Sequence, residues 1–386
     1  MELQTKVTKA FIDRFDHAPT WVVRAPGRVN LIGEHTDYND GYVMPLAIDR
    51  QILIALCKRT DQKVLVHSLD YDETLEILPS SLISRGNTGW GEYVSAIAFV
   101  MTRAGYGLQG WDGVVAGDIP KGAGLSSSAA LELAVANAFT LASDIPWEPL
   151  KMAQLSQQAE NEWVGMQCGI MDQMISACGI AGHALMIDCR SLEHTPVALP
   201  HGTAVVVMDT GTRRGLLDSA YNERRRQCQE AAQMFGKTVL RDVDRNTFEK
   251  GAFKLTDLQR RRARHVIAEN NRVLLAMQAM QSQDAHALGR LMVASHTSLR
   301  DDFEVSSREL NIMVECALKA PGCLGARMTG AGFGGCAVAL ITAEARTPFT
   351  DIVTQKYVDA TGIQPSMYVC QAKGGVDILP DGSFSQ

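Results

Sequence analysis

The sequence predicts an α+β fold in two halves. Short runs rich in Val, Ile and Leu come first, and helical patterns begin near residue 91. A proline–glycine break in "LPHGTAVVVMD" then precedes a new buried strand. Strands and helices do not alternate regularly, as they would in a doubly wound sheet. The 386 residues suit two domains or one large one, and we place two domains at 1–200 and 201–386.

The elements of the first half follow from the spacing of apolar residues. Val7, Phe11 and Phe15 recur at helical spacing near the N-terminus. Strands are predicted over 20–25, 28–32, 50–59, 63–69 and 74–78, where short apolar runs lie between turn residues. Longer periodic stretches predict helices over 91–105, 127–143 and 148–165, and two more strands follow over 183–189 and 195–200.

The second half contains long charged helices and one glycine-rich loop. Helical patterns cover 219–235 and 257–280, and the loop lies within 325–341, ahead of a buried strand. Residues 373–386 fit no element, and we expect a tail. Three arginines at 224–226 and three at 260–262 stand among Glu and Gln on these helices, which favours solvated faces over an anionic partner.

Composition excludes several classes of protein. The net charge of −6 argues against a nucleic-acid binder, whose footprint would be basic. Nine cysteines without a C-x-x-C pair indicate a reducing compartment and no structural zinc. We find no signal peptide and no apolar run near the roughly 18 residues of a membrane span. We therefore expect a cytoplasmic protein, and no feature indicates an obligate protein partner.

The segment "GAGLSSSAALE" is a candidate phosphate loop. Gly122 and Gly124 allow close backbone approach, and the three serines that follow are good N-cap residues for a helix. The positive end of that helix can bind phosphate. Ala123 stands where a Walker A loop would have its lysine. Taken alone, the segment fits an ordinary capped turn equally well.

Three other segments carry polar residues that chemistry could use. "GRVNLIGEHTDYNDGYVMP" crowds Arg28 and several acceptor side chains between apolar flanks, as expected of a site for a polyhydroxylated ligand. Asp172 is a lone acid in apolar "CGIMDQ", either a helix cap or a functional carboxylate. "RMTGAGFGGC" has four glycines in six residues, so its backbone packs against a ligand or another loop, or simply bends. Together these segments supply what phosphoryl transfer needs.

These segments resemble one family specifically. "GRVNLIGEHTDYNDGYVMP" resembles the galactokinase signature, and "PKGAGLSSSAALE" and "MTGAGFGGC" resemble the second and third motifs of the GHMP kinase superfamily. "CGIMDQ" is also similar to galactokinases, and the resemblance covers nearly the whole chain. It implies a ribosomal protein S5 domain 2-like N-terminal domain, a ferredoxin-like C-terminal domain and an active site between them.

The resemblance also implies residue roles. Asp172 would accept the proton of the sugar's anomeric hydroxyl, and Arg28 would stabilise the transition state and hold Asp172 ionised. An arginine there weakens the carboxylate as a base, so whether Asp172 is a true base or mainly orients the hydroxyl stays open. Galactose would contact Glu34, His35, Asp37, Gly169 and Tyr221.

ATP would bind the phosphate loop with Mg²⁺. Ser128 and Glu160 would coordinate the metal, and Trp90 resembles, more weakly, a tryptophan near the adenine. The phosphates would lie against Gly122, Ala123, Gly124, Leu125, Ser126, Ser127 and Ser128.

The implied activity is that of a galactokinase. It would convert α-D-galactose and ATP into galactose 1-phosphate and ADP, the first committed step of galactose catabolism by the Leloir pathway. Two alternatives stay open: a regulator that binds galactose and ATP without turnover, and a related hexose or N-acetylhexosamine 1-kinase. "GEHTDYND" favours galactose over N-acetylgalactosamine.

Overall fold

A six-stranded sheet organises the first half of the computed structural model, which describes residues 2–79, 89–213 and 217–380. Its strand order is β13-β1-β3-β6-β4-β5, and only the β4–β6 pair is parallel. The strands are β1 (Trp21–Asn30), β3 (Pro45–Lys58), β4 (Val64–Ser68), β5 (Glu73–Ile77), β6 (Trp111–Gly117) and β13 (Asp377–Leu379).

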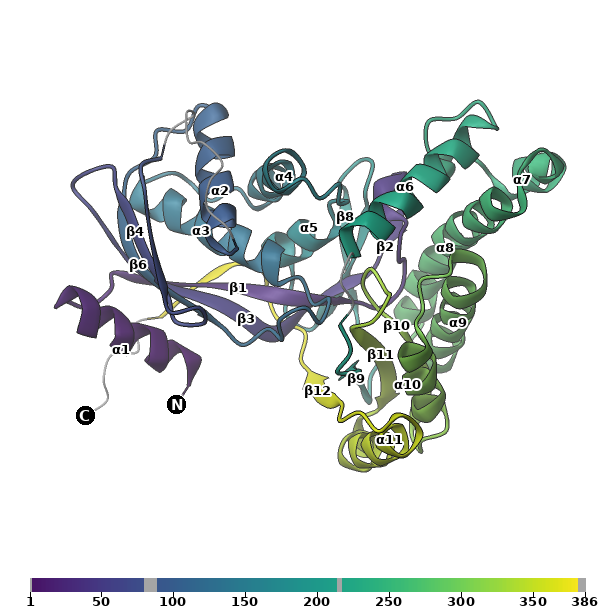
Figure 1. The fold of residues 1–386 in the computed structure, drawn as a ribbon. Helices are drawn as coiled ribbons and strands as arrows, with labels where there is room; N and C mark the ends of the chain where they lie inside the picture. The colour runs from purple at the N-terminus through teal and green to yellow at the C-terminus, as the bar shows by residue number, and fades with distance from the viewer. Residues whose placement is uncertain (1, 80–88, 214–216, 381–386) are drawn as a thin grey trace.

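Helices cover both faces of this sheet (Figure 1). One face packs against α1 (Leu3–Phe15) through Val7 and Phe11, as the spacing predicted. The other carries α2 (Gly91–Arg103), α3 (Ser127–Ala142), α4 (Pro149–Ala159) and α5 (Met171–Cys178). Nearly every side chain of α3 is buried. The predicted stripe of Leu131, Val135 and Phe139 is therefore only part of its contact with the core.

The second half builds a four-stranded sheet with helices along one side (Figure 1). Its order is β10-β11-β9-β12, all antiparallel, and β9 and β11 are almost entirely buried. The strands are β9 (Thr203–Asp209), β10 (Cys323–Met328), β11 (Cys336–Thr342) and β12 (Ser366–Cys370). The helices are α6 (Leu217–Gln233), α7 (Arg245–Gly251), α8 (Asp257–Gln281), α9 (Ala285–Ser298), α10 (Arg308–Leu318) and α11 (Arg346–Thr361).

Two smaller features complete the architecture. A three-stranded sheet joins β2 (Tyr42–Val43), β7 (His183–Asp188) and β8 (His194–Ala198). Helix α8 starts with a capping box between Thr256 and Gln259, which satisfies backbone donors at its N-terminus. Both halves contain a sheet together with helices, which confirms the α+β prediction.

Several local predictions are wrong. The predicted strands 20–25 and 28–32 form one strand, β1, with an irregular register between Pro26 and Arg28. Residues 377–379 are no tail, because β13 pairs with β1; residues 381–386 of that predicted tail lie outside the described residues. Strand β6 was not predicted at all.

One arginine of each cluster differs from the prediction of solvated faces, whereas Arg226 is 62% exposed, as predicted. Arg262 is 2% exposed and pairs with Glu304, and Arg224 is partly buried with its guanidinium on the carbonyls of Phe303 and Glu304. These two side chains connect α6 and α8 to residues 303 and 304. The domain boundary after residue 200 stays a prediction, although β13 places the end of the chain in the first sheet.

No helix in the described part of the chain is long and apolar enough to cross a membrane.

Candidate active site

The phosphate loop leads into a helix whose first turn faces the loop. Ser126 occupies the N-cap position of α3, in a left-handed conformation with φ of 60°, and its side chain makes no capping bond. Its hydroxyl instead donates to Asp172 Oδ2. The first backbone N–H groups of a helix have no partner within the helix. The serines thus begin the helix as predicted, but the Ser126 hydroxyl binds Asp172 instead of capping a backbone N–H group.

The glycine-rich third segment (residues 327–336, "RMTGAGFGGC") packs against the phosphate loop. Gly335 has φ of +79°, and a Cβ there would lie 2.9 Å from the Ala123 carbonyl oxygen. Phe333 also has positive φ, at 61°. Glycine is needed at Gly335 because a side chain would collide with the phosphate loop. The prediction that this backbone packs against another loop is confirmed.

An ion pair joins Arg28 of β1 to Asp172 in the first turn of α5. Arg28 Nε donates to Asp172 Oδ1 at 2.7 Å, and Nη2 donates to Oδ2 at 2.5 Å. Its Nη1 donates to the Gly124 carbonyl at 2.6 Å, so the same guanidinium holds the phosphate loop. Burial lowers the pKa of Arg28, but the charges of Asp172 and Glu34 outweigh burial and the net shift is upward. The guanidinium therefore stays charged beside the loop.

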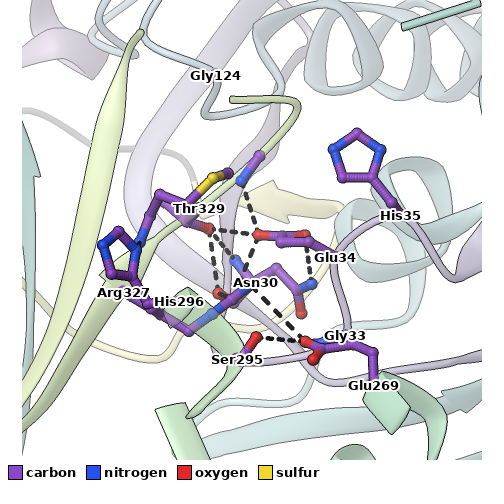
Figure 2. A network of polar contacts seen from close by, with 12 residues as sticks. Asn30, Gly33, Glu34, His35, Gly124, Glu269, Ser295, His296, Arg327 and Thr329 are labelled. Atoms are coloured by element: carbon purple, nitrogen blue, oxygen red, sulfur yellow. Dashed lines mark hydrogen bonds and ion pairs between the residues drawn. The ribbon is translucent and has the colours of Figure 1, made fainter. Parts of the chain in front are cut away.

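Glu34 is sealed into a hydrogen-bond network (Figure 2). Its Oε1 accepts from the Gly330 N–H at 2.7 Å and from the Thr329 hydroxyl at 3.0 Å, and Oε2 accepts from Asn30 Nδ2 at 2.7 Å. Arg327 Nη1 lies 3.4 Å from Oε1. The sequence motifs pointed to Glu34 but gave no role to Asn30, Arg327 and Thr329. All three lie inside the quoted motifs, which was the available signal.

His35 lies apart from that network and is held in its neutral form (Figure 2). Its backbone has positive φ, at 62°, a strained conformation typical of functional sites. Nε2 lies 3.2 Å from the Ala331 carbonyl and Nδ1 lies 2.9 Å from the Tyr38 hydroxyl. Burial is the main cause that lowers the pKa of His35 to about 3. Both ring nitrogens thus already have protein partners.

Another side of the site cavity is lined by Asp37, Gly169 and Tyr221. Burial, helped by the negative charge of Asp172, raises the pKa of Asp37 to about 7. A Cβ on Gly169 would lie 2.0 Å from Asp37 Oδ2, so only glycine fits there. The Tyr221 ring packs against the His35 and Tyr38 rings, at centroid distances of 5.6 and 5.2 Å.

Glu160 and Ser128 provide a hydroxyl and a carboxylate beside the loop. Glu160 is buried, hydrogen-bonded to Ser128, and accepts from Gln173 Nε2 at 2.7 Å. Burial and the charge of Asp172 raise the pKa of Glu160. A bound cation would offset the unfavourable burial of a negative charge on Glu160. Mg²⁺ is typically held by one or two protein carboxylates together with substrate phosphates. The pair therefore fits the predicted metal. The described residues contain no cluster of three or more His, Cys, Asp or Glu able to hold a metal by themselves.

Two adjoining cavities collect the predicted residues. A cavity of about 320 Å³ is lined by all of them except Ala123 and Trp90. Trp90 lines a neighbouring cavity of about 860 Å³, which shares Ser127, Ser128 and Tyr93 with the first. Ala123 lies in a small gap between the phosphate loop and the glycine-rich third segment. The structure thus brings together segments that are far apart in the sequence.

Comparisons with known proteins identify the family. A family model described as the galactokinase galactose-binding signature matches residues 9–58, and models of the N-terminal and C-terminal GHMP kinase domains match 92–180 and 276–359. A galactokinase from Roseiflexus sp. (strain RS-1) is 44% identical over 99% of this chain and 98% of its own length. This chain belongs to the galactokinase family.

Solved structures agree with that assignment. The crystal structure of Lactococcus lactis galactokinase complexed with galactose superposes with a TM-score of 0.94 at 34% identity, covering 98% of this chain and 100% of its own. The mevalonate kinase of Methanococcus jannaschii, at 17% identity over 92% of this chain and 98% of its own, has a TM-score of 0.65 and shares the fold. The predicted GHMP kinase fold is confirmed.

Proposed function

We propose that this chain transfers the γ-phosphoryl group of ATP to the anomeric hydroxyl of galactose, giving galactose 1-phosphate and ADP. The Arg28–Asp172 pair carries the proposal, because it lines the cavity between the phosphate loop and the segment that resembles the galactokinase signature. The Lactococcus relative was crystallised with galactose, which supports the choice of sugar. The bond formed joins the sugar oxygen to phosphorus, and the bond broken releases ADP.

Asp172 holds the attacking hydroxyl in this mechanism. Its side chain is 28% exposed, yet both of its oxygens already accept hydrogen bonds from Arg28 and Ser126. A carboxylate shared in this way is suited to orienting a hydroxyl and to receiving its proton late in a loose transition state. Arg28 balances the negative charge that develops on the transferring group.

The phosphates lie against the N-terminus of α3 and the loop Gly122–Ser128. Backbone N–H groups there take the place of the Walker A lysine. Ser128 and Glu160 would hold Mg²⁺, which, when bound, neutralises phosphate charge. The adenine would occupy the larger cavity beside Trp90, whose Nε1 is held by Glu73 Oε2 at 3.1 Å.

The sugar occupies the smaller cavity. Glu34 and Asp37 offer carboxyl oxygens, while His35, Gly169 and Tyr221 shape the walls. We also retain the expectation of a cytoplasmic enzyme.

An ADP-release assay with MgATP tests the proposal. We expect turnover with galactose, and much less with glucose and N-acetylgalactosamine in a panel that also includes 2-deoxygalactose. Binding of galactose without ADP release would instead indicate a non-catalytic regulator. Equal activity on glucose and galactose would contradict the sugar assignment.

The proposed Mg²⁺ site at Ser128 and Glu160 is tested separately. Glu160→Gln should raise the Mg²⁺ concentration needed for half-maximal turnover by about 10-fold or more, because a carboxylate ligand becomes a neutral amide. Glu162→Gln, two residues away on the exposed side, is the matched control. An unchanged Mg²⁺ requirement in Glu160→Gln would remove Glu160 from the metal site.

A further inference from the structure

Arg327 is the last charged residue of β10 before the glycine-rich loop, and its side chain is fully buried. Its Nη1 donates to the Asn30 carbonyl at 3.1 Å and to Glu34 Oε1 at 3.4 Å. It lines neither of the two site cavities. Arg327 can therefore reach a substrate only through the residues that it holds.

The residues that follow Arg327 hold the same carboxylate. Thr329 and Gly330 both donate to Glu34 Oε1, while the Thr329 hydroxyl also contacts the Asn30 backbone. These donors lie about 300 positions from Glu34 along the chain. Figure 2 shows the Glu34 carboxylate between Asn30 and this strand end. One oxygen of Glu34 is thus saturated by the third segment, and Oε2 has a single donor, Asn30.

A second buried carboxylate fixes the backbone just before Glu34. Glu269 of α8 accepts from the Gly33 N–H at 3.0 Å and from Ser295 at 2.5 Å, and its Oε1 lies 4.0 Å from Arg327 Nη2. Arg272 Nε donates to its other oxygen at 2.6 Å. Two arginines and two carboxylates therefore share this enclosed space. Charges sealed from water need such partners.

We propose that Arg327 and Thr329 are positioning residues for the sugar: they hold the Glu34 carboxylate so that its freer oxygen faces the galactose cavity. The glycine-rich third segment then serves both halves of the site, packing on the phosphate loop through Gly335 and aligning the sugar-binding acid through Arg327, Thr329 and Gly330. This inference rests on the proposed function of Glu34.

Arg327→Met removes the guanidinium and keeps most of the volume. We expect the KM for galactose to rise about 10-fold or more, because a charged hydrogen-bonding group loses its alignment. The KM for MgATP and kcat should stay within about 2-fold. Arg262→Met, which removes another buried arginine paired with a carboxylate, is the control and should leave the galactose KM unchanged.

Thr329→Val keeps the test decisive if Arg327→Met does not fold. It removes only the hydroxyl, so we expect weaker galactose binding by titration calorimetry without nucleotide, and Thr329→Ser should restore it. The double variant Thr329→Val with Glu34→Gln should bind galactose no more weakly than Glu34→Gln alone, because both substitutions act through the Glu34 carboxylate. Additive losses, or equal effects on galactose and MgATP, would overturn the inference. Absence of galactose binding by the unmodified protein would instead contradict the proposed function.

Discussion

Two arginine–carboxylate pairs cross the site, and they differ in their access to solvent. In the Arg28–Asp172 pair the carboxylate side chain is 28% exposed and faces the cavity, whereas in the Arg327–Glu34 pair both side chains are at most 2% exposed. The first pair has short bidentate contacts, and the second relies on a network of neutral donors around the acid. Asp172 is accessible enough to exchange partners with a substrate, whereas the Arg327–Glu34 contact fixes the position of Glu34 at the wall of the same cavity.

The two pairs should also differ in how much they contribute to stability. Water can solvate Asp172 if its arginine is removed, but it cannot reach Glu34 to the same extent. Removing one partner of a buried pair is costly when the remaining charge stays sealed from water, and it costs less when water can reach that charge. The Arg28 side chain is 6% exposed, so only the carboxylate of the first pair is accessible. The two arginines should therefore respond differently to the same substitution.

The largest expected effect is on turnover. Asp172→Asn should lower kcat by at least about 10³-fold while galactose still binds, because the amide cannot accept the proton of the hydroxyl. ADP release and calorimetry with galactose measure the two quantities.

Asp61→Asn provides the control for that variant. Asp61 also pairs with an arginine, Arg59, but at the surface, so kcat should not change. Turnover by Asp172→Asn at the rate of the unmodified protein would end the assignment of Asp172 to the reaction.

The next effect concerns stability. Arg327→Met should lower the free energy of unfolding by about 3–5 kcal/mol, because Glu34 is left buried and charged. Arg28→Met should cost less, about 1–2 kcal/mol, but should reduce kcat strongly. Urea unfolding of both variants measures the difference. Equal losses of stability would contradict the contrast between the sealed pair and the accessible one.

The smallest effect depends on pH and tests Asp37. Burial raises its pKa from 3.8 to about 7, so between these values the folded state binds a proton that the unfolded state has lost. The contribution of Asp37 to stability therefore falls as pH rises through this window. Without sugar, Asp37→Asn should gain about 2–4 kcal/mol relative to the unmodified protein between pH 4 and pH 8.

Unfolding curves of the two proteins at several pH values measure this difference. Asp40→Asn is the matched control, because Asp40 lies in the same turn and is partly exposed in an ion pair with Arg190. A stability difference for Asp37→Asn that does not vary with pH would show that Asp37 is ionised throughout.

Local sequence patterns were enough to predict several helices, the glycine-rich loops and the family. Apolar spacing identified α1, α2 and α3, because helical periodicity is a property of neighbouring residues. The glycines of "GAGLSSS" and "GAGFGG" indicated close backbone approach, and the order of the motifs indicated the family. Strand β13 escaped this reasoning, because its three residues gain their structure only by pairing with β1.

Only the tertiary structure decided which groups meet. Arg28 and Asp172 are 144 positions apart, and Arg327 and Glu34 are 293 apart; no periodicity relates such residues. Their contacts follow from how the two sheets and α5 are arranged, and so does the difference in burial between the pairs. The sequence alone named Arg28, Glu34 and Asp172. It did not show that both carboxylates line one cavity, with the Asp172 side chain 28% exposed and the Glu34 side chain 2% exposed because Thr329 and Gly330 hold one of its oxygens.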